Sequence, residues 1–122
     1  LPLWLSPIQV RVIPIADRFL KEAEKIVDEI KKHQIRVDLD DRSITVQKKI
    51  REAEMEWINY VLVFGEKEIA SGVLQVRDRK TRKIRKMQIQ ELIEEIKKKT
   101  RGKPFNPSTL PRLLTMSPRF YG

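Results

Sequence analysis

The apolar run "YVLVF", from Tyr60 to Phe64, constrains the fold of this chain more than any other stretch. Five consecutive apolar residues are too few for a buried helix, and such a run is typical of a central strand that is covered on both faces. Helices must therefore lie on both sides of the sheet that contains it. This requirement predicts an α/β fold.

The residues before this run repeat a strand-helix pattern. "IQVRVIP" (8–14) and "IRVDL" (35–39) predict strands, and helices are predicted over 18–33 and 44–57. Asp17 is a suitable N-cap for the first helix. Because crossovers between strands of one sheet are right-handed, the first three strands are expected to be parallel. The second helix carries an apolar stripe that is expected to be buried, formed by Val46, Ile50, Ala53 and Trp57.

The pattern after the central strand changes to a hairpin. "GVLQVRDR" and "IRKMQI" flank the turn "KTRK", and a last helix is predicted over 90–100. The expected fold class is α/β, with a mixed five-stranded sheet of three parallel strands plus an antiparallel hairpin, and three helices. We expect one domain over 1–100 and a proline-containing C-terminal tail over 101–122. The tail's apolar residues suggest that part of it packs, namely Phe105, Leu110, Leu113 and Leu114.

Charge is unevenly distributed along the 122 residues, whose net charge is +9. Residues 1–40 carry seven basic and seven acidic side chains, so the whole excess lies in the rest of the chain. A locally basic protein usually binds nucleic acid, an anionic membrane or an acidic protein. The alternative is a lysine-rich solvated surface like those of thermophilic proteins. No apolar run is long enough to span a membrane.

Catalytic and metal-binding patterns are missing from the sequence. His33 is the only histidine and there is no cysteine, which leaves no partner for a zinc site or a Ser-His-Asp arrangement. The glycines match neither a phosphate-binding loop nor a dinucleotide fingerprint. We therefore expect no catalytic residue and no metal ligand in this segment. The absence of cysteine fits an intracellular protein.

The densest basic segment is the predicted hairpin, where seven of the ten residues in 77–86 are Lys or Arg. A hairpin presents these charges as a stiff finger that suits phosphates. The second helix adds Lys49 and Arg51, and Arg42 precedes its N-terminal turn, where free backbone N–H groups attract anions. The alternative is that Arg51 pairs with a neighbouring glutamate and the hairpin is merely solvated.

Glu68 places a carboxylate close to this basic cluster. RNA readers act on unstacked bases of loops, where they bind the Watson–Crick edge. Guanine presents two donors on that edge, and a carboxylate accepts both. Arg77, on the outward face of the adjoining strand, is placed to donate to base acceptors. The alternative is that Glu68 is an ordinary turn carboxylate.

Five ordered blocks carry a resemblance to a known family: "LPLWLSPIQVRVIPI", "QIRVDLDDR", "KKIREAE", "YVLVFGEKEIASGVLQVRDR" and "GKPF". Together they resemble the C-terminal anticodon-binding domain of archaeal threonyl-tRNA synthetases, a class II synthetase fold. The resemblance implies binding to the anticodon loop of threonine tRNA, with the second-position guanine and third-position uridine read by Glu68 and Arg77. It further implies roles for Arg51 and Ser43. The expected anticodon-binding set is Glu68, Arg77, Arg51, Ser43, Arg42, Lys49 and Arg79.

The resemblance also implies properties of a longer parent protein. Since the chain begins at Leu1 without a methionine, we expect a domain cut from a larger protein. That parent would be a cytoplasmic, homodimeric threonine-tRNA ligase whose upstream catalytic domain uses ATP with magnesium, and zinc. The fragment itself would be non-catalytic and would need no cofactor. The alternative is a non-catalytic protein-interaction or dimer-stabilising module of a synthetase-like protein.

Overall fold

Five strands form one sheet in the order β2-β1-β3-β4-β5. The computed structural model describes residues 2–103, 105 and 113–116. The strands are β1 (Val10–Pro14), β2 (Val37–Leu39), β3 (Tyr60–Phe64), β4 (Leu74–Asp78) and β5 (Lys83–Met87). β1 pairs in parallel with both β2 and β3, while β4 is antiparallel to β3 and to β5. The mixed five-stranded α/β sheet is thus confirmed, although four strands share one direction, because β5 reverses β4.

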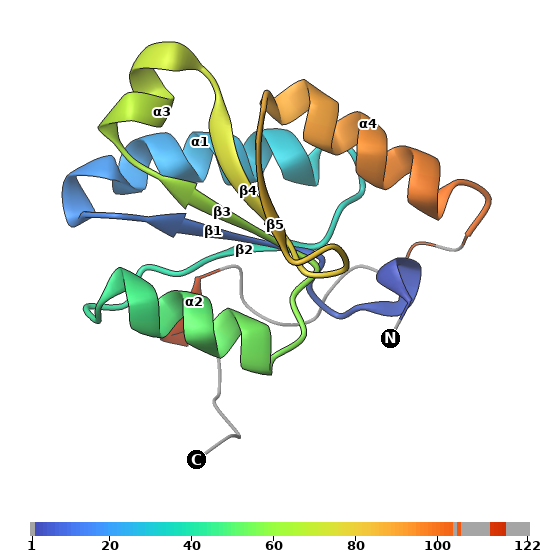
Figure 1. Cartoon of the computed structure of the whole chain (residues 1–122), viewed down its shortest axis with the longest axis horizontal. Coiled ribbons are helices and arrows are strands. Elements are labelled where there is room, and N and C mark those ends of the chain that lie inside the picture. The colour runs from blue at the N-terminus through green and yellow to red at the C-terminus, as the bar shows by residue number, and fades with distance from the viewer. Residues whose placement is uncertain (1, 104, 106–112, 117–122) are drawn as a thin grey trace.

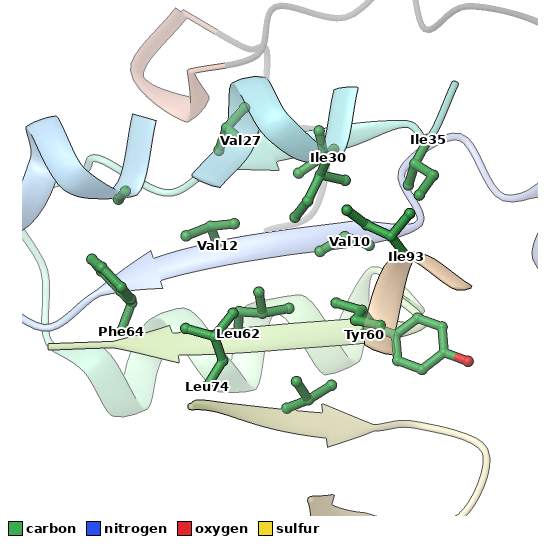
Figure 2. Close-up of a cluster of buried hydrophobic side chains, with 14 of the residues drawn as sticks. Val10, Val12, Val27, Ile30, Ile35, Tyr60, Leu62, Phe64, Leu74 and Ile93 are labelled. Carbon is green, nitrogen blue, oxygen red and sulfur yellow. The ribbon is translucent and has the colours of Figure 1, made fainter. Parts of the chain in front are cut away.

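Helices cover both faces of the central strands, as the apolar run requires (Figure 1). α1 (Leu20–Lys31) and α4 (Ile89–Thr100) lie on one face, and α2 (Val46–Met55) lies on the other. The side chains of β3 alternate between the two. Tyr60 and Leu62 join the larger core cluster beneath α1 and α4 (Figure 2), whereas Val61 joins Ala53 and Ile58 in the smaller cluster beneath α2.

A fourth helix, α3 (Glu66–Ser71), corrects the expectation of three. Six residues are too few to show a helical period, so the pattern "EKEIAS" carries no signal for it. Its ends are nevertheless well defined. The Glu68 carboxylate accepts a hydrogen bond from the Gly65 N–H at 2.7 Å, and Gly72 closes the helix with φ +74°. Gly65 has no room for a Cβ, which would collide with the Ile15 side chain.

The second helix is shorter than expected, and the expected burial of Trp57 is wrong. α2 begins after Thr45, whose hydroxyl accepts from the Lys48 N–H at 3.2 Å, and it ends at Met55. The N–H groups of Trp57 and Ile58 then bond back to the carbonyls of Glu54 and Ala53, which is a Schellman closure. Trp57 therefore adopts φ +60° and is 64% exposed. Ile58, not Trp57, completes the buried stripe.

A buried arginine connects the sheet to α2. Arg11 of β1 is 1% exposed, and its guanidinium donates two hydrogen bonds of 2.9 Å to Asp38 of β2. It donates two more, at 2.7 and 3.1 Å, to Glu56 at the end of α2. Four charge-assisted bonds in a fixed planar geometry thus join three elements.

Part of the expected tail packs against the sheet edge. Leu113 forms a parallel bridge with Leu39 of β2, and Leu114 is 2% exposed. Thr115 donates to the Asp41 carboxylate from both its N–H and its hydroxyl, at 3.0 and 2.9 Å. Leu110 lies outside the described residues. None of the helices in the described part of the chain has the length and apolar character that crossing a bilayer requires.

Replacing Trp57 by glycine tests the revised position of this ring. Glycine relieves the left-handed conformation, which costs other residues roughly 1 to 2 kcal/mol, but it loses a surface contact and gains unfolded-state entropy. We expect the free energy of unfolding of Trp57→Gly to stay within about 1 kcal/mol of the wild type. Urea denaturation measures it. A buried tryptophan would instead cost at least about 3 kcal/mol on truncation.

Replacing Arg11 by methionine tests the buried ion cluster. The substitution leaves Asp38, which is 3% exposed, as a buried charge without its counterion. We expect a loss of roughly 3 to 5 kcal/mol in the free energy of unfolding. The double variant Arg11→Met/Asp38→Leu removes that charge and should recover a large part of the loss. Equal destabilisation of the single and double variants would show that the arginine acts through packing alone.

Candidate nucleic-acid interface

The α2-side face of the β4–β5 hairpin forms an open surface beside α2. Alternation along β4 buries Leu74 and Val76 and turns Gln75 and Arg77 to this face, where both are half-buried. The apolar side of α2 packs on the central strands and leaves the hairpin uncovered. A groove runs between the two elements, lined by Ile50, Glu54, Val61, Arg77, Arg79 and Ile84.

Arg77 is the basic side chain best placed to bind a ligand in this groove. It pairs with Val61 in the sheet register, so the strand fixes its position. Its Nε is buried and has no hydrogen-bond partner among the described residues. The side chain as a whole is half-buried and lines the groove, where a ligand can reach it. Arg51, predicted for the same site, is exposed on α2.

Glu68 lies at a different end of the sheet from Arg77. It belongs to α3, which follows the last residue of β3, Phe64, whereas Arg77 pairs with Val61. Along β3, Phe64 and Val61 lie three residues, or about 10 Å, apart. The two side chains line different pockets and do not converge on one point. The capping bond fixes the Glu68 carboxylate, whose oxygens together accept about four hydrogen bonds, so acceptor capacity remains.

Two of the other predicted residues are committed to the fold. Lys49 is 5% exposed, and its Nζ donates to the Asp40 carbonyl at 3.2 Å, so it faces the interior and not the surface. Arg42 bonds Asp40 at 2.8 Å and pairs with Glu52. The hydrogen bonds that Arg42 donates to Asp40 raise the pKa of Arg42. Nothing in the sequence predicted the burial of Lys49 or the pairing of Arg42, because both residues lie in a polar stretch.

Ser43 and Arg79 remain accessible, in different settings. Ser43 is exposed in the loop before α2, and Thr45 takes the cap position. Arg79 is half-buried, and its guanidinium lies 4.0 Å from the centre of the Trp57 ring. It also donates to the Glu54 carbonyl at 2.9 Å. The sequence did not predict the Arg79–Trp57 contact, because the second helix was expected to continue through Trp57.

The basic run over 77–86 divides between the two faces of the hairpin. Arg85 points to the α4 side, where it bonds Glu95 at 2.7 Å and Asp78 at 3.0 Å. Tyr60 donates its hydroxyl hydrogen to the same glutamate at 2.7 Å. Arg85 therefore fastens β5 to α4 and does not belong to a phosphate-binding finger. The exposed cations of the run are Lys80, Arg82, Lys83 and Lys86.

Within the described residues, no group of three or more His, Cys, Asp or Glu side chains could hold a metal ion. The chemistry that this surface offers is hydrogen bonding and charge. Arginine donors and an exposed ring lie on the α2 side of the sheet, whereas the oriented carboxylate of Glu68 lines a pocket beside α1.

Comparison with known proteins identifies the family. A family model described as "Anticodon binding domain" matches residues 9–99, and the chain belongs to this family. Among curated relatives, the threonine–tRNA ligase of Thermococcus sibiricus is 49% identical over 99% of this chain and 19% of its own length. The corresponding enzyme of Pyrococcus furiosus is 50% identical over the same shares. The chain thus spans about a fifth of the length of these relatives.

A solved structure shares the fold. The crystal structure of the RNA binding domain of threonyl-tRNA synthetase from Cryptosporidium parvum Iowa II has a TM-score of 0.75 and 30% identity. It covers 88% of this chain and 26% of that one. The resemblance to the anticodon-binding domain of threonyl-tRNA synthetase is therefore confirmed.

The Glu95 cluster predicts a pH dependence of stability. Hydrogen bonds from Arg85 lower the pKa of Glu95 to about 2, from an ordinary value of 4.5. A depressed folded-state pKa contributes stability that is fully present above the unfolded pKa and is lost as pH falls toward 2. We expect Glu95→Gln to cost about 1 to 2 kcal/mol at pH 7, allowing for solvent screening. The difference from wild type, measured by urea denaturation, should shrink between pH 5 and 2.

Proposed function

We propose that this chain binds the anticodon loop of threonine tRNA, as the anticodon-binding part of a threonine–tRNA ligase. The observation that carries the proposal is Arg77, a half-buried arginine that lines the open groove beside α2, in a member of the anticodon binding domain family. Single-stranded loops suit such a surface, because their unstacked bases expose hydrogen-bonding edges. Arg51 on α2 and Ser43 in the loop before it are exposed.

The base assignment rests on the resemblance to the threonyl-tRNA synthetase family. Glu68 accepts two hydrogen bonds from the Watson–Crick edge of the second-position guanine, and Arg77 donates to an acceptor of the third-position uridine. The two readers come from different elements, Glu68 from α3 and Arg77 from β4, so they contact different nucleotides of a splayed loop. The capping bond to Gly65 supports this role, because it holds the carboxylate in one orientation before RNA binds.

The larger protein that we propose joins threonine to its tRNA. Its ATP, magnesium and zinc would be bound by residues outside this chain, in a catalytic domain, and the enzyme would be a cytoplasmic homodimer. The competing function is a non-catalytic module for protein interaction or dimer stabilisation. Such a module has no need of base discrimination, so RNA specificity separates the two.

Glu68→Gln tests the base assignment without disturbing the fold. Glutamine also serves at the third position of a capping box, so α3 should remain intact. One acceptor becomes a donor that faces a guanine donor, which should cost roughly 1 to 3 kcal/mol in binding. We expect the affinity ratio between anticodon stem-loops with guanine and with adenine at the second position to fall about tenfold. Filter binding or calorimetry measures both affinities at one salt concentration.

Glu66→Gln is the matched control. Glu66 lies in the same helical turn, carries the same charge and is exposed, with only a 3.8 Å ion pair to Arg18. Its replacement should raise the affinity for both RNAs slightly and leave their ratio unchanged. If Glu68→Gln behaves in the same way as this control, Glu68 is not the guanine reader. If the wild-type chain binds neither stem-loop, the interaction module becomes the better explanation.

A further inference from the structure

A second cleft lies at the end of the sheet opposite α3, between the N-terminal segment, the β4–β5 turn and the end of α2. Its walls combine two tryptophans with several basic side chains, namely Trp4, Trp57, Arg79, Lys80, Arg82 and Lys99. In Figure 1 the N-terminal turn and the β4–β5 turn lie at this end of the sheet. The base assignments proposed above use none of these residues.

Trp57 is held in an unusual position at the edge of this cleft. It occupies the left-handed position after α2, with φ +60°, where helices most often carry glycine. A bulky residue in this conformation is an outlier, and such strain concentrates at functional sites. The ring remains 64% exposed although the Arg79 guanidinium lies 4.0 Å from its centre. Arg79 therefore covers one face of the ring and leaves the other open to a ligand.

The charges around the ring favour an anion. Four cations line the cleft, and its one carboxylate, Asp78, is 4% exposed and already accepts from Arg85 and from the Lys80 N–H. Asn59 also lines the cleft, and its buried Oδ1 has no hydrogen-bond partner among the described residues. A positive groove with an aromatic face is the arrangement that holds single-stranded nucleic acid through phosphate contacts and base stacking.

The cleft continues the groove that contains Arg77. Asp78, Arg79 and Arg82 line both. Along β3, Glu68 lies beyond Phe64, Arg77 pairs with Val61, and the Arg79 N–H bonds the Asn59 carbonyl. Arg77 and the Arg79–Trp57 pair thus follow one another along the α2 side of the sheet, whereas Glu68 lines a pocket beside α1.

We propose that the open face of Trp57 stacks on the base of the nucleotide that follows the third anticodon position, while the cleft's cations contact its phosphate. The position follows from the cleft's place next to the Arg77 groove and rests on the proposed function, in which Arg77 reads the third base. Arg79 orients the ring from its other face. The contact adds affinity that depends little on which base is present, because every base offers a π-face.

The test pairs a protein variant with an RNA variant. Trp57→Gly removes the ring at a position that glycine suits, so the variant should fold, and Trp57→Phe keeps an aromatic face. The RNAs are a threonine anticodon stem-loop and the same molecule with an abasic nucleotide after the third anticodon position. We expect Trp57→Gly to weaken binding of the intact stem-loop roughly 5- to 150-fold, and Trp57→Phe to weaken it much less.

The abasic RNA identifies the contact. It should bind the wild type more weakly by a similar factor, and Trp57→Gly should add little further loss, because both changes remove one interaction. Additive losses would place the ring against another part of the RNA and overturn the assignment. Trp4→Phe leaves Trp57 as the single tryptophan of the chain, and its fluorescence should be quenched by the intact stem-loop but not by the abasic one.

Failure of this inference is distinguishable from failure of the proposed function. If the wild type discriminates guanine at the second position but Trp57→Gly binds as tightly and Trp57 emission is unchanged, stacking is excluded and the anticodon assignment stands. If the wild type binds no stem-loop, both proposals are wrong. Quenching that is equal with both RNAs would show a backbone contact in place of stacking.

Discussion

The buried guanidinium of Arg11 is the interaction on which the rest of the structure depends. It stands on a central strand and bonds a carboxylate from the edge strand β2 and another from the end of α2. A buried charge is tolerated only with such partners, so its demand for them fixes where α2 ends and how it lies on the sheet. The helix consequently covers β1 and β3 and leaves the hairpin face open. The groove that holds Arg77 exists because of that placement.

The strong positive charge of the chain serves two purposes that only the packing distinguishes. Within the fold, Arg42 pairs with Asp40 and Glu52, Lys49 donates to a backbone carbonyl, and Arg85 pairs with Glu95. These cations position the loops and the helices. Arg51, Arg77 and the exposed cations of the hairpin remain available to phosphates or bases. Net charge therefore overstates the size of the interface, although it correctly indicates the kind of partner we propose.

The structural role of Glu68 prepares the binding role that we propose for it. Its bond to the Gly65 N–H closes the first turn of α3 and also fixes the direction of the carboxylate. A carboxylate on a free loop would lose side-chain entropy when it bound a base, and this one has already lost it on folding. Trp57, beside Arg79, is oriented in a comparable way by a Schellman closure and a cation–π contact.

The sequence by itself determined the order and type of the long elements. The run Tyr60–Phe64 required cover on both faces, and alternation along Leu74–Asp78 indicated the exposed side of the hairpin. Glu68 and Arg77 came from local charge and from the family resemblance. Only the tertiary structure decided that α3 exists, that Trp57 lies outside α2, and that Arg42 and Lys49 are not free. Periodicity reports which residues share a face over several turns, whereas a six-residue helix, a helix end and the partner of a charged side chain depend on contacts between segments distant in the sequence.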